Sequence, residues 1–355
     1  MGGIRSCGPS RMRRARGFAS STTGMRSPCA AGLRPISPEG TMRRRFETIP
    51  YRFTVKGEIH VGGGEAIYPS HYRLTDRGLE VLAGDGTEGV AYPLLLDEAK
   101  RRRLGATLPI IHAFKRSPLD HEPFLPGSAV KGALRTVTAY HLLRGDAGYR
   151  RRLERRLLAA RRGREVGGVF ERVLFQGNEG TSRFDRFRAF SFSEARIRGE
   201  GVLALRLLSS EEGMEIVSAE HRFEGRLRLE RGLFTRRETR AAMSWSEVVD
   251  VGDFSNFQRR LADAAQRMIE ETLLPILPAE EGTLLSRVLA KRGEAIPLFI
   301  GRGGGWMHHA FPPLLTDGVQ AHLRRLGVIS GKGPVVPRAL LGFGLLAFDR
   351  AQGGA

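Results

Sequence analysis

A short stretch at residues 124–135 brings together residue types that can bind a phosphate. It reads Phe-Leu-Pro-Gly-Ser-Ala-Val-Lys-Gly-Ala-Leu-Arg, a Pro-Gly turn followed by apolar residues at helical spacing, which predicts a helix over about 129–143. Ser128 can cap this helix by accepting a hydrogen bond from a first-turn N–H. Lys131 and Arg135 would share an exposed face near the positive end of the helix dipole. The stretch therefore predicts either a phosphate seat or a capped surface helix with two solvated cations.

Two glycine-rich segments each follow a predicted strand. Residues 51–59 alternate apolar and polar, typical of a half-buried strand, and lead into His-Val-Gly-Gly-Gly-Glu at 60–65. A short apolar strand at 296–300 leads into Gly-Arg-Gly-Gly-Gly at 301–305. Consecutive glycines permit positive φ and close approach of a ligand to the backbone, although a plain hairpin explains the first triplet equally well. The first segment does not have the spacing and following helix of a dinucleotide-binding motif.

The composition indicates a polyanionic partner. The 355 residues include 57 Lys and Arg against 38 Asp and Glu, a formal net charge of +19. Such an excess favours nucleic acid as the partner, with solvated surface charge as the alternative. Cys7 and Cys29 are the only cysteines, so disulfides and Cys-ligated zinc are excluded from residue 46 onward. No run is apolar and long enough to span a membrane.

The composition also predicts three parts. Residues 1–45 hold ten Arg and one acid, are rich in Gly, Ser and Pro, and show no apolar periodicity. We expect disorder there, or an upstream mis-called start with Met42 as the initiator; an organelle transit peptide also fits the composition. A first domain is expected at 46–205 and a second at 206–350. Within the first, residues 144–172 hold ten Arg against four acids, which predicts either a solvated basic helix or a contact with an RNA backbone.

These motifs resemble those of the RAMP proteins, the ferredoxin-like RNA-binding subunits of CRISPR systems. Residues 126–135 read PGSAVKGALR, similar to the family's PGSSxKGALR. Residues 60–65 resemble the HIGSGE loop after the first strand of Csm-type RAMPs, and 301–309 resemble the second glycine loop, lGxGtGxxxKt. Residues 337–345 resemble the closing PkTrrl…LGWv, with Phe343 for Trp. The resemblance covers about 46–349, in the family's order.

The combination points to the Csm subunit that caps the 3′ end of the crRNA in type III-A effector complexes. It implies an α+β fold of two ferredoxin-like (RRM-like) domains with basic insertions. It also implies a non-catalytic, cytoplasmic ribonucleoprotein subunit for antiviral defence, without a cofactor. Its partners would be the crRNA, target RNA indirectly, and the backbone RAMP, small and large polymerase-like Csm subunits. The residues expected at the RNA are His60, Gly62, Gly63, Gly64, Gly127, Ser128, Lys131, Arg135, Gly301, Arg302, Gly303, Gly304, Gly305 and Arg338.

A RAMP endoribonuclease, which processes crRNA or cuts target RNA, is the main alternative. His60, beside the first glycine segment, is the best candidate for a general base. The nine His and the scattered acids give no metal-binding constellation. Another type III RAMP subunit, or a basic RNA-binding protein outside CRISPR, also stays open.

Overall fold

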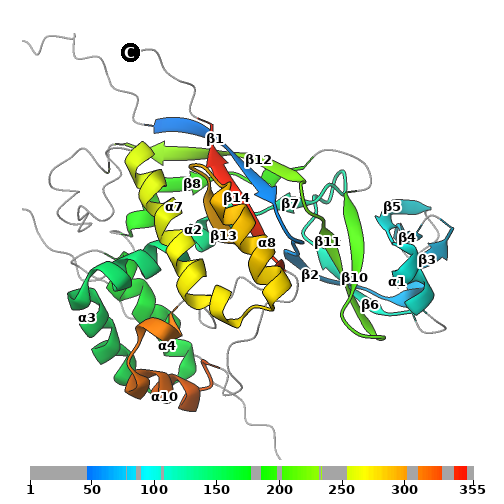
Figure 1. The fold of residues 1–355 in the computed structure, drawn as a ribbon. Helices are drawn as coiled ribbons and strands as arrows, with labels where there is room; N and C mark the ends of the chain where they lie inside the picture. The colour runs from blue at the N-terminus through cyan, green and yellow to red at the C-terminus, as the bar shows by residue number, and fades with distance from the viewer. Residues whose placement is uncertain are drawn as a thin grey trace, which may run out of the picture. The chain divides into compact units, whose positions relative to one another are not determined.

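Strands from both ends of the chain lie side by side in one sheet, sheet A (Figure 1). The computed structural model describes residues 46–76, 78–84, 89–104, 108–176, 185–197, 202–231, 233, 254–301, 311–329 and 340–349. The order in sheet A is β13-β14-β1-β12-β9-β7, and β8 also pairs with β12. These strands are β1 (Phe46–Val55), β7 (Phe124–Leu125), β8 (Phe190–Phe192), β9 (Ala195–Arg196), β12 (Arg222–Glu230), β13 (Ile296–Phe299) and β14 (Phe343–Phe348).

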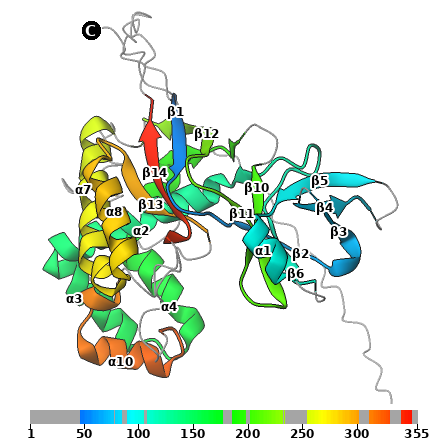
Figure 2. The ribbon, with the colours of Figure 1, turned by 45° about the vertical axis from the view of Figure 1, so that its right-hand side comes forward.

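One face of sheet A is buried beneath helices α2 (Gly127–Gly145) and α7 (Phe254–Thr272) (Figure 2). The central strands β1 and β12 alternate buried and exposed residues, and Phe53 lies opposite Phe223 in their antiparallel register. Phe190 of β8 stacks on Phe257 of α7 with ring centroids 5.5 Å apart. The period of two in the strands and 3.6 in the helices thus directs both apolar faces into one core.

The elements of sheet A follow the order of a ferredoxin-like fold. The sequence β1–α2–β8–β12–α7–β14 is a βαββαβ unit, and its antiparallel strands lie in the order β14-β1-β12-β8. This unit runs through the whole described chain, and the remaining elements are inserted between its members. The predicted α+β class is confirmed.

Sheet B is assembled from two of these insertions. Its order is β2-β6-β11-β10-β5-β4-β3, in which β5–β10 and β6–β11 are parallel. The strands are β2 (Gly62–Ile67), β3 (Tyr72–Thr75), β4 (Gly78–Leu82), β5 (Val90–Leu95), β6 (Ile110–Phe114), β10 (Leu203–Leu207) and β11 (Glu212–Val217). Each sheet takes strands from both sides of residues 205/206, so the predicted domain division does not follow the sheets. Strand partners are chosen by long-range packing, which a periodic pattern does not encode.

The other described helices lie outside the βαββαβ unit. They are α1 (Glu98–Arg103), α3 (Ala147–Leu158), α4 (Gly163–Phe170), α8 (Ala279–Ala290) and α10 (Asp317–Arg325), with short turns Pro69–His71, Glu171–Phe175, Arg186–Ala189, Leu274–Ile276 and Pro312–Leu314. Asp146 ends the helix expected at 129–143 and starts α3, because its carboxylate accepts hydrogen bonds from the N–H groups of Gly148 and Tyr149 at 2.7 and 3.2 Å. The expected disorder of residues 1–45 lies outside the described residues. None of the described helices is long and apolar enough to cross a membrane.

Candidate nucleic-acid interface

The first glycine segment forms an edge of sheet B. Strand β2 is the terminal strand of the order, and its register with β6 shifts between Gly62 and Ala66, so the residues between them form a bulge. Gly62 and Gly64 are exposed, and Gly64 has φ +84°. An edge strand presents N–H groups that its own sheet does not use, and a bulge re-aims them. Such N–H groups can bind phosphate oxygens without reading bases.

The two other predicted segments lie next to this edge. The backbone N–H of Lys115 donates to the carbonyl of Val61 at 2.7 Å, and the Lys115 carbonyl accepts from the N–H of Phe124 at 3.1 Å. Lys115 therefore connects the glycine edge, Gly62–Gly64 of β2, to Phe124. Phe124 is the first residue of the stretch 124–135, the signature stretch. Gly301, at the start of the second glycine segment, lies against the residue that precedes Val61: a Cβ on Gly301 would be 2.1 Å from the carbonyl oxygen of His60. The structure therefore brings together three segments that are far apart in the sequence.

Helix α2 begins earlier than the sequence indicates, at Gly127. Its N-cap is Pro126, which supplies no side-chain hydrogen bond, and Ser128 is exposed within the first turn. The prediction that Ser128 caps the helix is therefore wrong. The reason is Gly127, which is buried so closely against β8 that a Cβ would lie 2.0 Å from the carbonyl oxygen of Phe192. This close approach sets where the helix starts.

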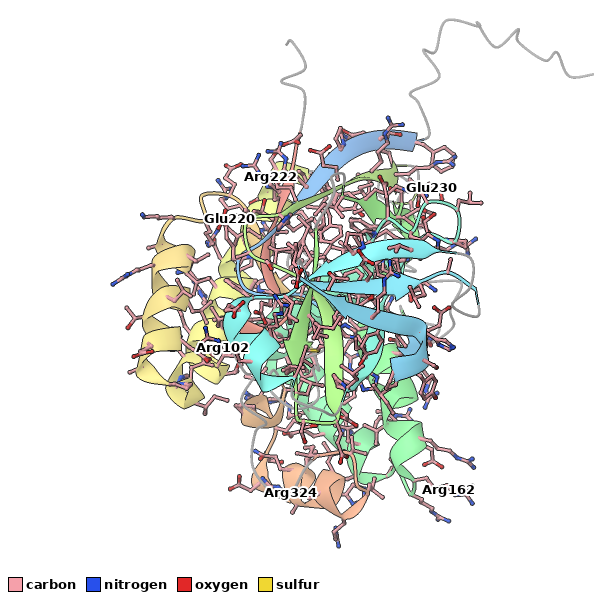
Figure 3. All side chains as sticks on the ribbon, turned by 90° about the vertical axis from the view of Figure 1, so that its right-hand side faces the viewer. Arg102, Arg162, Glu220, Arg222, Glu230 and Arg324 are labelled. Carbon is pink, nitrogen blue, oxygen red and sulfur yellow. The ribbon has the colours of Figure 1, made fainter. Side chains whose placement is uncertain are left out.

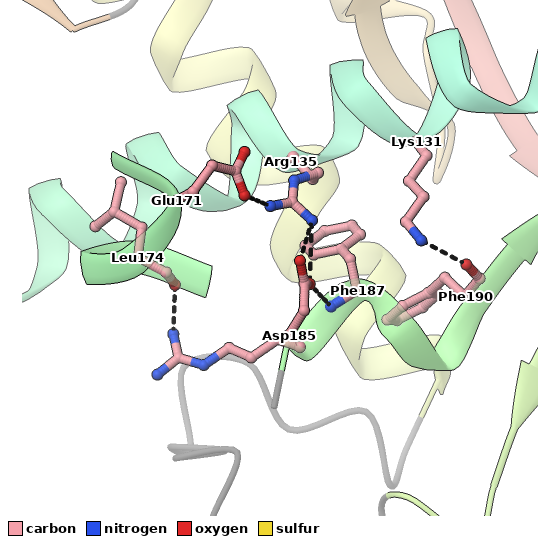
Figure 4. A network of polar contacts seen from close by, with 8 residues as sticks. Lys131, Arg135, Glu171, Leu174, Asp185, Phe187 and Phe190 are labelled. Carbon is pink, nitrogen blue, oxygen red and sulfur yellow. Dashed lines mark hydrogen bonds and ion pairs between the residues drawn. The ribbon is translucent and has the colours of Figure 1, made fainter. Parts of the chain in front are cut away.

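Lys131 and Arg135 are engaged within the protein, as Figure 4 shows. The Lys131 ammonium donates to the carbonyl of Phe190 at 3.1 Å, and partial burial lowers its pKa. Arg135 donates from Nη1 to both carboxylate oxygens of Asp185 at 3.0 and 2.9 Å, and from Nη2 to Glu171. Its guanidinium also lies over the ring of Phe175, 4.0 Å from the centroid. The expectation of an exposed cation pair is wrong, because Glu171, Asp185 and Phe190 lie over this face of α2; a contact with RNA stays a prediction.

A cavity of about 320 Å³ opens between α2, α4 and the end of β13. Its lining is mainly apolar and joins the signature helix to the second glycine segment through Ala129, Gly132, Phe170, Phe175 and Gly301. Arg135 and Glu171 supply the charged part of its wall. The other predicted members of the second segment and the closing motif, Arg302, Gly303, Gly304, Gly305 and Arg338, lie outside the described residues.

The geometry does not favour His60 as a general base. Its side chain is 4% exposed, and Nδ1 lies 2.7 Å from the carbonyl oxygen of Glu215. The ring contacts Phe114 edge-on, with centroids 6.1 Å apart. A general base must reach the proton that it removes, and the burial of the ring together with the contact of Nδ1 with Glu215 works against that role. In the part of the chain that the structure describes, no three His, Cys, Asp or Glu side chains are grouped to hold a metal.

Glu215 is a buried acid that the sequence did not single out. Its carboxylate accepts hydrogen bonds from the Tyr92 hydroxyl and the Phe114 N–H, both at 2.7 Å, and lies 3.5 Å from Nε of Arg116. Burial raises its pKa, and Arg116 opposes that shift. These contacts hold the C-terminal end of β6, which Lys115 follows, against β11. This place lies beside the glycine edge. One Glu inside an apolar run is the only signal that the sequence offered.

Glu215→Gln should change how stability depends on pH. A carboxyl whose folded pKa is raised stabilises the protein below its ordinary range, and this contribution is lost as pH rises through the raised value. The wild type should therefore lose stability relative to Glu215→Gln between mildly acidic and neutral pH. Thermal unfolding across that range measures it, with the exposed Glu224→Gln on β12 as the control. Parallel pH profiles for wild type and Glu215→Gln would contradict the assignment.

Comparison with known proteins identifies the fold. No protein-family model and no curated protein matches the chain. One similar structure is a chain of a Csm–crRNA–target RNA ternary complex of a type III-A CRISPR-Cas system, with 14% identity, a TM-score of 0.58, and coverage of 85% of this chain and 100% of that one. Another is T. onnurineus Csm5, with 13% identity, a TM-score of 0.55, and coverage of 83% and 99%. The chain therefore has the α+β RAMP fold of the Csm proteins of type III-A CRISPR systems.

Proposed function

We propose that this chain is a non-catalytic RNA-binding subunit of a type III-A Csm effector complex, and that it caps the 3′ end of the crRNA. The observation that carries the proposal is the meeting of the glycine edge, the start of α2 and Gly301 at one place. The similar chain in a Csm–crRNA–target RNA complex supports it. Its partners are then the crRNA and the other Csm subunits, and it meets target RNA through them.

Backbone groups supply most of the contacts in this proposal. The exposed edge at Gly62–Gly64 offers N–H donors, and Ser128 adds a hydroxyl at the start of α2. Lys115 and Lys131 lie on the segments that meet there and provide positive charge. Binding through phosphates is sequence-blind and weakens steeply with salt. This suits a subunit that must accept every crRNA, whatever its spacer.

Gly64→Asp tests the glycine edge, with Gly89→Asp as its matched control. Both glycines have positive φ (+84° and +100°), both are exposed, and a Cβ on either would meet no other atom within 4 Å. The two variants therefore share the same kind of backbone strain and the same charge change. Gly64→Asp should weaken crRNA binding by about tenfold, because a carboxylate then faces the phosphates. Equal crRNA affinities for the two variants, measured by filter binding, would remove the glycine edge from the site.

An exonuclease footprint tests the capping role. Csm complex reconstituted with this chain should protect the crRNA 3′ end from a 3′ exonuclease, and complex without it should yield shorter RNA. RNA sequenced from the tagged protein in its native host should carry a repeat-derived 5′ end and spacer sequence. Equal digestion with and without the chain would refute capping, and ribosomal fragments as the bound RNA would refute the Csm assignment.

A further inference from the structure

Nine exposed arginines gather on α3, the start of α4 and the end of α10. We name this surface the arginine face; Figure 3 labels two of its members, Arg162 and Arg324, at the same end of the molecule. The face consists of Arg151, Arg152, Arg155, Arg156, Arg161, Arg162, Arg164, Arg324 and Arg325. None of them belongs to the glycine edge or the start of α2, and none lines the cavity beside α2. The face is therefore a separate feature.

Packing fixes these arginines on one surface. Helix α3 buries Leu153 and Leu157, and α10 buries Val319 and Leu323, which leaves the arginines of the face on the exposed sides of both helices. Nε2 of His322 lies 2.9 Å from the carbonyl oxygen of Ala160 at the end of α3. The two helices are therefore joined close to their arginines.

The start of α4 closes the gap between the two groups of arginines. Gly163 lies so close to the end of α10 that a Cβ on it would be 2.7 Å from the carbonyl oxygen of Leu326. Arg162 and Arg164 therefore flank a direct backbone contact with the segment that follows Arg324 and Arg325. The start of α4 thus links the arginines of α3 to those of α10.

Little of this charge is balanced by an acid. The Glu165 carboxyl, whose pKa is lowered first by the backbone N–H of Arg161, also interacts with Arg162 and Arg164. Among the described residues, no ion pair joins an arginine of the face to a carboxylate, whereas two exposed arginines elsewhere, Arg73 and Arg102, are each paired with a glutamate. Of the nearby acids, Glu154 accepts from the N–H of Thr316 at 2.8 Å and Glu165 from the N–H of Arg161 at 2.9 Å. Like charges gathered in this way repel one another, and an external anion relieves the repulsion.

We infer that the arginine face binds the phosphate backbone of RNA without reading its sequence. Guanidinium groups match phosphate in two-point hydrogen bonds. A protein partner fits less well, because the cores of protein interfaces are apolar and depleted in charge. The face offers one exposed large apolar side chain among its described neighbours, Leu158 at 51% exposure. The inference goes beyond the proposed function, since it gives the chain a second RNA contact away from the glycine edge.

The test removes four charges from the face and, separately, four from another surface. The face variant carries Arg→Gln at 151, 152, 155 and 156, and the control carries Gln at the exposed Arg259, Arg267, Arg287 and Lys291 of the α7–α8 region. Fluorescence anisotropy with a labelled single-stranded RNA of mixed sequence, read on the full chain at several salt concentrations, gives affinity and salt slope. The face variant should bind about tenfold more weakly, and its slope should fall by about 0.7 for each phosphate that is no longer bound. The control should bind like the wild type.

Two further measurements make the result decisive. Arg324→Gln with Arg325→Gln, on a different helix, should weaken RNA binding in the same direction, so the inference does not depend on the folding of one variant. The face variant should still protect the crRNA 3′ end from the 3′ exonuclease, which separates this inference from the proposed function. Equal losses of affinity in face and control variants would overturn the inference. Normal RNA affinity combined with failure to join the other Csm subunits would overturn it in favour of an acidic protein surface.

Discussion

Gly127→Ala should destabilise the protein by about 3 kcal/mol, since a methyl group there overlaps a backbone atom that cannot rotate away. Its Cβ would lie 2.0 Å from the Phe192 carbonyl oxygen and 2.9 Å from that of Ser193. Either α2 or the β8–β9 connection must move. Because Lys131 donates to Phe190 on the same strand, that movement also disturbs the proposed RNA site.

Gly132→Ala, five residues later in the signature stretch, should instead stabilise the protein. A Cβ at Gly132 meets nothing within 4 Å, and alanine in a helix interior is more stable than glycine by about 1 kcal/mol. The midpoints of denaturant unfolding should therefore move in opposite directions from wild type, with similar slopes. Destabilisation of the same size in both variants would show that the close approach at Gly127 does not exist.

The signature stretch shows how far the sequence alone could go. The spacing of its apolar residues was sufficient to predict the helix, because helical periodicity is a local property of the sequence. The strand expected at 296–300 also appears, as β13, and the one expected at 51–59 overlaps β1. The motif order was sufficient for the RAMP fold, as the structural comparison confirms.

The sequence could not show which side chains and which strands pair with each other. Arg135 reads as an exposed cation because its acids lie 36 and 50 residues further along the chain. Only the folded chain shows that its side chain is 16% exposed and held between them. The same limit explains Glu215, whose burial depends on the pairing of β11 with β6, and the course of both sheets across residue 205. Charge is visible in a sequence, but the pairing of charges is not.

Arg135→Met should destabilise the free protein by about 2–3 kcal/mol, because it removes the cation and leaves two carboxylates, Glu171 and Asp185, near each other. Methionine retains the apolar stem over Phe175, so the loss reports mainly the charge. Adding Asp185→Asn should recover part of it, since asparagine can still accept the hydrogen bond from the Phe187 N–H. The double variant should therefore lose less stability than the sum of the two single variants, by about 1 kcal/mol or more.

The pH dependence of the stability of Arg135→Met is a second test of whether Arg135 stabilises the two carboxylates. Burial already raises the pKa of Glu171, and Arg135 opposes this shift, so its removal raises that pKa further. A raised folded pKa means stability that is present at low pH and lost as pH rises. The deficit of Arg135→Met relative to wild type should thus shrink in acid, as thermal unfolding at several pH values would show. If the variant instead unfolds like the wild type at every pH but binds crRNA more weakly, Arg135 acts on the RNA and the two carboxylates do not depend on it.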